Sequence, residues 1–305
     1  MVFTIFEIRA SIFTTAILLL SILSGNAATP AELAEHTLVD RMEAVEKPFD
    51  QLSHQQLSTS GIAALKIEPK KWRHAESDHF IIHYQLWDVK NRLIREAEYY
   101  YWKIQDDLKL TKDLADHKSH IFVFQDEKCW YAFQAVSGMH GIAGVTMGDE
   151  FFCYYPKKQD KDFSGTVAHE MTHLVFNRFF MGQPPLWLNE GFAEYQAHNA
   201  FQSLFGKRLG AINKDASLVG QIDFLDMTRW TTYKPNISIN QAFYVKSQLA
   251  VGLLVDKGGP ERFVQFINTM IHNPDFTEAF DRHYRDVFKD MDKFLKELAR
   301  KEKKL

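Results

Sequence analysis

The sequence has little cysteine, little net charge and no repeated unit, and each shortage argues against a class of protein. Two cysteines among 305 residues are too few for a small fold held together by several disulfides. A formal net charge of −3, with both signs interspersed, lacks the basic patch that nucleic-acid-binding proteins present. No unit recurs with a period of about 20 to 50 residues, which argues against solenoids and propellers.

What the sequence does contain is enough apolar material for a large core. Hydrophobic residues make up 46% and aromatic residues 14%, while charged residues stay at 25%, as in a globular protein. After residue 70, no stretch rich in proline, glycine and serine divides the chain. We therefore expect one domain of catalytic size over residues 78–305.

The first 27 residues are predicted to be a cleaved signal peptide. Arg9 precedes the apolar run Ser11–Leu23, and small residues follow in "SGNAA". The run is too short to span a bilayer comfortably, so cleavage near Ala27 is favoured over the alternative, an N-terminal membrane anchor. The mature chain is then expected to be secreted or periplasmic, without stable insertion in a membrane.

Residues 28–77 are predicted to be a helical extension that precedes the main domain. The segment "TPAELAEH", from Thr29, combines a capping threonine, a proline and a glutamate in the pattern of a helix N-terminus. The helix is expected to continue to about Glu46. The following residues 47–77 have weak periodicity and several turn formers, so they are expected to pack on or beside the domain, with a propeptide role left open.

The two cysteines have two interpretations. Export to an oxidising compartment would allow Cys129 and Cys153 to form a disulfide. Two separate buried thiols fit the sequence equally well.

The first part of the domain is predicted to be rich in strands. Segments 79–87 and 119–125 are dense in β-branched and aromatic residues, and a helix is expected between them at 89–109. A short helix follows, and a flexible glycine-containing loop then leads to a strand pair at about 143–147 and 150–155.

The part of the chain after Asp162 is predicted to be helical. Its turn formers place breaks at 182–185, 206–216, 231–237, 258–260 and 273–274. Strands early and helices late indicate an α+β fold.

The segment "VAHEMTHLVF", residues 167–176, carries the first signal of chemistry. His169 and His173 are four residues apart, so a helix presents both imidazoles on one face, as a tetrahedral zinc ion requires. Glu170 is rotated by about 100° from His169 and is placed to act as a general base without binding the metal. The alternative is a core helix whose histidines bond to backbone or carboxylate groups.

A second segment, "PPLWLNEGFAEY", supplies the missing ligand. A catalytic zinc site usually has three protein ligands, and Glu190 follows His173 at a distance that lets the chain turn and return antiparallel. Glu194, one turn further on, is expected to accept the free ring N–H of a ligand histidine. The alternative of a solvated acidic helix face fits poorly beside Trp187 and Phe192.

With these two motifs the chain resembles the gluzincin branch of zinc metallopeptidases, which includes thermolysin and the M1 aminopeptidases. It most resembles the small single-domain proteins called peptidase MA-like. The match is specific over residues 167–195 and looser over about 77–259. The resemblance implies a zincin-like fold, in which a small mixed sheet with an edge strand for substrate precedes the helices of the active site. It also implies one Zn²⁺ per chain, bound by His169, His173 and Glu190.

The resemblance further implies a hydrogen-bond donor for the oxyanion. Tyr244 is the candidate because it lies in a downstream helix where such families have a tyrosine, although a core aromatic is nearly as good an interpretation. Tyr233 and His198 are weaker alternatives.

One departure from the family affects the expected substrate. M1 aminopeptidases have a G-x-M-E-N segment whose glutamate binds the free amine of the substrate, whereas this chain reads "GVTMGDEFF", with Asp149 or Glu150 as possible substitutes. Exopeptidase activity is therefore not favoured. The residues Gly144, Val145, Thr146 and Met147 are instead expected to bind an extended peptide by strand addition, which favours an endopeptidase.

The sequence thus predicts a secreted zinc peptidase acting on a peptide or protein. A zinc-containing binding protein that does not cleave its ligand is the alternative, and the presence of Glu170 argues against it. A hydrolase without zinc is disfavoured because neither a G-x-S-x-G motif nor a recognisable cysteine nucleophile occurs. The oligomeric state is left open.

Overall fold

A computed structural model describes residues 43–85, 87–139, 142–155, 160–206 and 216–305. Residues 44–305 form one compact unit. The predicted signal peptide and the predicted helix start at Thr29 lie outside the described residues. None of the described helices combines the length and hydropathy that a bilayer crossing requires.

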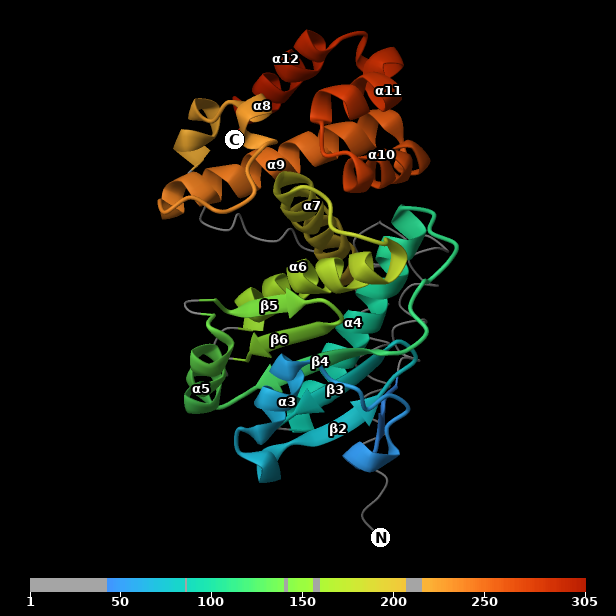
Figure 1. The fold of residues 1–305 in the computed structure, drawn as a ribbon, viewed down its shortest axis with the longest axis vertical. Coiled ribbons are helices and arrows are strands. Elements are labelled where there is room, and N and C mark those ends of the chain that lie inside the picture. Colours follow the sequence, from blue (N-terminus) through green and yellow to red (C-terminus); the bar gives the residue numbers. More distant parts are fainter. Residues whose placement is uncertain (1–42, 86, 140–141, 156–159, 207–215) are drawn as a thin grey trace, which may run out of the picture. The chain divides into compact units, whose positions relative to one another are not determined.

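A six-stranded mixed sheet forms the first part of this unit, with strand order β1-β2-β3-β4-β6-β5 (Figure 1). Its strands are β1 (Val45–Glu46), β2 (Arg73–Glu76), β3 (Phe80–Tyr84), β4 (Ser119–Phe124), β5 (Gly144–Met147) and β6 (Glu150–Tyr154). The central strands β3, β4 and β6 run parallel, and the outer pairs are antiparallel. Every residue of β3 and β4 is buried, as expected for strands covered on both faces.

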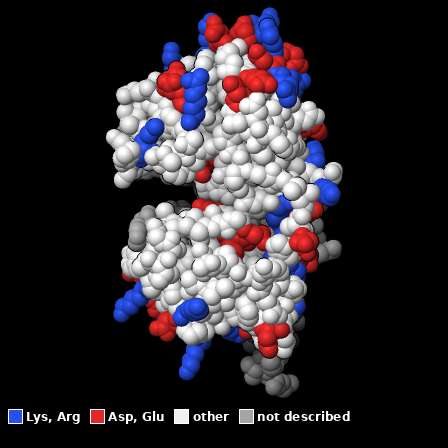
Figure 2. Space-filling model, in the orientation of Figure 1, with Lys and Arg blue, Asp and Glu red and all other residues white. Residues whose placement is uncertain are grey.

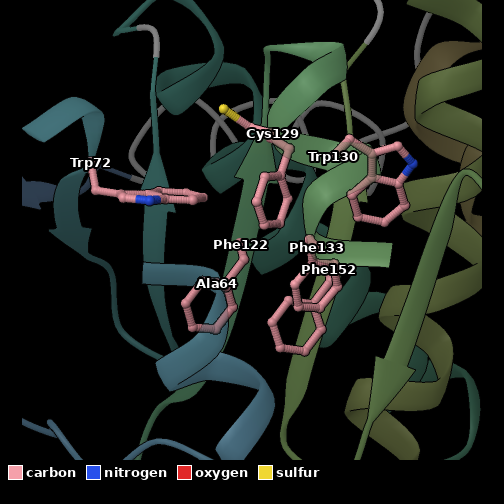
Figure 3. Close-up of a cluster of buried hydrophobic side chains, with 8 residues drawn as sticks. Ala64, Trp72, Phe122, Cys129, Trp130, Phe133 and Phe152 are labelled. Carbon is pink, nitrogen blue, oxygen red and sulfur yellow. The ribbon is translucent and has the colours of Figure 1, made fainter. Parts of the chain in front are cut away.

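One face of the sheet packs on the short helices α3 (Thr59–Lys66) and α5 (Glu127–Ser137). Aromatic rings fill the space between them, as Figure 3 shows. Phe152 stacks at 4.7 Å on both Phe122 and Phe133, measured between ring centroids. The other face is covered by α4 (Trp87–Asp107) and α6 (Asp160–Phe179).

The rest of the chain is helical, in agreement with the sequence. The helices are α7 (Leu186–Phe205), α8 (Phe224–Met227), α9 (Ile237–Gly258), α10 (Pro260–His272), α11 (Phe276–Phe288) and α12 (Met291–Glu302), with short 3-10 turns at Phe49–Gln51, Pro69–Lys71 and Ala216–Gln221. The expected breaks separate α6 from α7, α9 from α10 and α10 from α11. One further break was not predicted: Lys289, with φ of 70°, ends α11, and Asp290 caps α12.

Residues 44–77 belong to the same compact unit as residues 78–305. The predicted helix was expected to reach Glu46, but Val45 and Glu46 instead form strand β1 and pair with β2. Strand β2 pairs in turn with β3, and helix α3 packs against α5. These elements are stabilised by partners far away in the sequence, so local periodicity gave no signal for them.

Candidate metal centre

The candidate metal centre lies between helices α6 and α7. Helix α6 packs against strands β5 and β6 on one side and against α7 on the other, and α7 packs against α9 (Figure 1). The buried Arg178 fixes the last turn of α6, because its guanidinium donates to the backbone oxygen of His117 at 2.9 Å and to Asp113 Oδ2 at 2.9 Å. Trp187 anchors the start of α7 with edge-to-face contacts to Phe224 and Phe276.

Three side chains from these helices converge. His169 and His173 of α6 and Glu190 of α7 offer ligand atoms within 4.8 Å of one another. The two Nε2 atoms are 3.2 Å apart, and Glu190 Oε2 lies 3.3 Å from His169 Nε2 and 3.5 Å from His173 Nε2. The structure therefore brings together the three ligands that the sequence predicts.

The size of this triangle fits a zinc ion. Ligands at the usual Zn–N and Zn–O distances of about 2.0–2.1 Å in a tetrahedron are separated by about 3.3–3.4 Å. The three observed distances of 3.2, 3.3 and 3.5 Å bracket that value. Two imidazoles and one carboxylate are also a ligand set that zinc enzymes use, with a fourth position left for water or substrate.

The outer ring nitrogens of both histidines have partners that fix the ring orientation. His169 Nδ1 lies 3.4 Å from Glu194 Oε1, and His173 Nδ1 lies 3.2 Å from Asn189 Oδ1. Such contacts select the tautomer that leaves Nε2 for a metal. Glu194 is placed as the sequence predicts, whereas the role of Asn189 was not predicted; its position directly before Glu190 was the available signal.

The electrostatics of the site favour a cation. Burial lowers the pKa of His169, but hydrogen bonds to Glu190 and Glu194 raise it more, and the net pKa lies well above the usual value. Burial raises the pKa of Glu190, but contacts with His173 and His169 outweigh it and hold the net pKa far below the usual value. The carboxylates thus stabilise positive charge in the site, and a bound divalent cation would supply that charge.

Glu170 lies beside the triangle and against strand β5. Thr146 Oγ1 donates to the backbone oxygen of Glu170 at 2.9 Å, so strand and helix are joined at this residue. A Cβ atom added to Gly144 would lie 3.4 Å from Glu170 Cγ and only 2.8 Å from a methyl carbon of Thr166. The glycine therefore lets β5 approach the helix closely at the candidate base.

The predicted peptide-binding residues Gly144, Val145, Thr146 and Met147 make up β5, the last strand of the sheet. Val145 pairs with Phe152 of β6, and the backbone oxygen of Ala143 accepts from Tyr154 N at 3.0 Å. Because alternate residues of an antiparallel strand bond to opposite sides, the backbone N–H and C=O groups of Gly144 and Thr146 point to the free edge. Figure 2 shows the surface hollowed between α9 and β5, with acidic side chains visible inside the hollow.

Tyr244 of α9 lies over the site, with its ring centroid 6.2 Å from that of His169. Its hydroxyl donates to the hydroxyl of Tyr233 at 3.0 Å, and Tyr233 hydrogen-bonds Glu190. Burial, followed by the charge of Glu190, raises the pKa of both phenols far above the usual value. Both tyrosines therefore remain protonated donors at neutral pH. His198 is on α7, one turn beyond Glu194.

The two acidic residues considered for an amine-binding role have other partners. Asp149 Oδ2 lies 2.6 Å from His117 Nε2, and its other oxygen accepts from the hydroxyl of Ser119. Glu150 accepts from the backbone N–H of Ser58 at 2.7 Å and from its hydroxyl at 2.5 Å, beside the start of α3. Neither carboxylate replaces the glutamate of the aminopeptidase segment.

The two cysteines do not form a disulfide: both are free and buried. Cys129 belongs to the aromatic cluster of α5, together with Phe152. Cys153 follows Phe152 in strand β6 and therefore points to the opposite face of the sheet. The sheet itself separates the two thiols.

Close packing of α7 on α9 was also not predicted. A Cβ atom on Gly191 would lie 2.5 Å from the backbone oxygen of Ser247. The glycine that follows Glu190 thus allows α9, which carries Tyr244, to approach the metal centre. The signal in the sequence was the glycine inside an otherwise helical motif.

No protein-family model matches the sequence, and no curated protein matches it. Among solved structures, the chain is similar to leukotriene A4 hydrolase from Saccharomyces cerevisiae, with 15% identity and a TM-score of 0.45 over 73% of this chain and 37% of that chain. It is also similar to a mutant two-domain M1 zinc metallopeptidase bound to L-tryptophan, with 12% identity and a TM-score of 0.38 over 83% of this chain and 50% of that chain. This chain thus matches half or less of the length of each protein. At these values the two likenesses do not place it in a family.

Proposed function

We propose that this protein is a zinc-dependent peptidase that hydrolyses internal bonds of a peptide or protein. The observation that carries the proposal is the His169–His173–Glu190 triangle, whose sides match a tetrahedral zinc ion, with Glu170 adjacent to it on α6. The fold that presents this site is a mixed sheet with an edge strand next to the helices, consistent with a gluzincin-like arrangement.

His169, His173 and Glu190 would hold the zinc. When bound, zinc supplies a Lewis acid that polarises a carbonyl group and acidifies a water molecule. Glu194 and Asn189 hold the two imidazole rings with Nε2 directed inward, so the ligand geometry is set before any substrate arrives.

Glu170 would act as the base. Its carboxylate accepts a proton from the attacking water and then donates that proton to the nitrogen of the leaving amine. The contact of its backbone oxygen with Thr146 fixes it relative to strand β5, where the substrate is expected to bind.

Tyr244 would donate a hydrogen bond to the oxygen that becomes negatively charged, with Tyr233 as the weaker alternative. The Tyr244 hydroxyl donates to Tyr233 at 3.0 Å and would turn to a carbonyl oxygen bound beside the histidines, whereas Tyr233 would first have to leave Glu190. Removal of such a donor costs about 3 kcal/mol of transition-state stabilisation in other hydrolases.

The edge strand supports the choice of an endopeptidase. The free backbone groups of Gly144 and Thr146 can pair with an extended substrate, which passes along the hollow in both directions. Asp149 and Glu150 have structural partners and supply no anchor for a free amine. The predicted signal peptide at residues 1–27 adds the proposal that the mature enzyme acts outside the cytoplasm, on substrates present there.

The test is the pair of variants Glu170→Gln and Glu261→Gln, the second being a matched change at an exposed position of α10. Each is assayed for zinc by elemental analysis and for cleavage of a quenched fluorescent peptide library. We expect Glu170→Gln to keep its zinc and lose hydrolysis, and Glu261→Gln to keep both. Full activity in Glu170→Gln would refute the assigned base. Zinc without cleavage in the wild type would indicate a binding protein instead.

A further inference from the structure

A second group of histidines gathers at the first strands of the sheet, apart from the candidate metal centre. It comprises His54, His74, His83, His117 and His120. His54, His117 and His120 line a cavity of about 950 Å³ together with Asp116 and Asp149. The proposed peptidase reaction uses none of these side chains.

Three of these rings form a chain of hydrogen bonds across strands β2, β3 and β4. His74 Nδ1 lies 2.7 Å from His83 Nδ1, and His83 Nε2 lies 2.9 Å from His120 Nδ1. Among the described residues, His120 Nε2 has no hydrogen-bond partner, although His120 is only 1% exposed. Whichever tautomers the three rings adopt, this series of hydrogen bonds ends at His120 Nε2, which has either an N–H without an acceptor or a lone pair without a donor.

Two further imidazoles, those of His54 and His117, line the same cavity as His120. The ring centroid of His54 is 5.4 Å from that of His120 and 4.3 Å from that of His117. His117 is held between two carboxylates, with Nδ1 2.6 Å from Asp116 Oδ1 and Nε2 2.6 Å from Asp149 Oδ2. A carboxylate on the far nitrogen of a histidine is the arrangement that orients metal-binding imidazoles.

The chemistry of this group suits a divalent transition metal. Neutral imidazole nitrogens together with a carboxylate oxygen are ligands that Zn²⁺, Ni²⁺ and Cu²⁺ prefer. The cavity lining carries the four carboxylates Asp78, Asp116, Asp149 and Glu150 but only two cationic side chains, Lys118 and Arg178. This excess of negative groups attracts a cation.

We propose that His54, His117 and His120, with Asp149, form a second metal site, which binds a divalent transition metal and joins the segment 52–57 to the sheet. As the side chains stand, their ligand atoms do not lie within 4.8 Å of one another, a limit that among the described residues only His169, His173 and Glu190 meet. Metal binding therefore includes a rotation of the His54 ring out of its stack on His117, and the metal replaces the proton shared by His117 Nε2 and Asp149 Oδ2. His54 lies outside the helices and strands, so the rotation breaks no regular hydrogen bond.

The test measures zinc in the purified full chain after dialysis against Zn²⁺, in the Glu190→Ala background that removes a ligand of the first site. We expect Glu190→Ala to retain one zinc per chain. That zinc should be lost on adding either His54→Ala or Asp149→Asn, and retained on adding His272→Ala, a change at an exposed histidine on α10. Circular dichroism checks that each variant is folded, and thermal unfolding should show a zinc-dependent rise in Tm only where the site is intact.

Two results would overturn the proposal: no zinc in Glu190→Ala, or zinc that persists with both His54→Ala and Asp149→Asn. The outcome also separates this site from the proposed function. If zinc in the wild type responds to His54→Ala but not to Glu190→Ala, the second site stands and the peptidase centre falls.

Discussion

The two histidine groups use the same side chain in opposite surroundings. On α6, His169 and His173 face the carboxylates of Glu190 and Glu194, and the pKa of His169 lies well above its usual value. Across the sheet, His83 faces His74 and His120, and burial together with its neighbouring imidazoles holds its pKa well below the usual value. The difference shows that the facing groups, and not burial alone, decide whether a buried histidine takes up a proton or stays neutral.

The largest effect that we expect is on zinc affinity, when a ligand of the His169–His173–Glu190 site is removed. Glu190→Ala removes the carboxylate that offsets the charge of a bound cation, and zinc affinity should fall by more than about 100-fold. Competition with a chromophoric chelator measures the change. Glu302→Ala, which removes a carboxylate that pairs with Lys246 on α9, is the control and should leave affinity at this centre unchanged. Equal affinity in Glu190→Ala would show that α7 supplies no ligand.

On the sheet side, a carboxylate instead holds the first described segment in place. Burial raises the pKa of Glu76, but hydrogen bonds from Lys47 and from the backbone and side chain of Ser53 lower it more, to about 2. Because the folded pKa is depressed, this stabilisation is present above the unfolded pKa of about 4.5 and is lost as pH falls towards 2. Glu76→Gln should lower the free energy of unfolding at pH 7 by about 2–3 kcal/mol.

The measurement is denaturant unfolding of wild type and Glu76→Gln between pH 7 and pH 3. The difference between the two should shrink as pH falls through this window. A constant difference would mean that Glu76 acts by packing and not by charge.

A third prediction tests how closely α9 must approach the metal centre. Gly191→Ala places a methyl group against the backbone oxygen of Ser247, which cannot rotate away, and should destabilise the fold by about 1–3 kcal/mol. Gly220→Ala is the control, because a Cβ atom there meets nothing within 4 Å. Thermal unfolding compares the two variants. If Gly191→Ala is as stable as the control, the close approach of α7 and α9 is not required.

The smallest expected effect concerns the orientation of one ring. Asn189→Ala leaves His173 Nδ1 without its amide partner, and zinc affinity should fall by about tenfold. Asn189→Asp keeps an oxygen acceptor and should restore affinity. Failure of Asn189→Asp to restore it would indicate that the amide acts on the fold of α7 and not on the histidine.

The site was more predictable from the sequence than the first strands of the fold. His169, Glu170 and His173 share one helix, so a spacing of four residues already implies a common face. Glu190 lies on the next helix, which the chain reaches after one turn, so its approach to the two histidines could also be predicted. The histidine cavity, in contrast, brings His54 close to residues more than sixty positions away in the sequence. Periodicity over a short stretch of sequence does not predict such a contact.

The elements of residues 44–77 escaped prediction for the same reason. Strand β2 is four residues long and gains its stability from pairing with β3, while α3 depends on Ser58 as its N-cap and on Glu150, 92 residues further along. Long helices such as α9 have capping residues at both ends, here Asn236 and Gly259. Their approximate ends can therefore be predicted from the local sequence.

The position of the two thiols has a consequence for how the protein is made. Cys129 and Cys153 lie on opposite faces of one sheet, so no oxidant can link them within a folded molecule. Folding therefore contains no oxidative step, and refolding yield should be the same with and without a reducing agent. The native state is therefore reached independently of any disulfide-forming machinery.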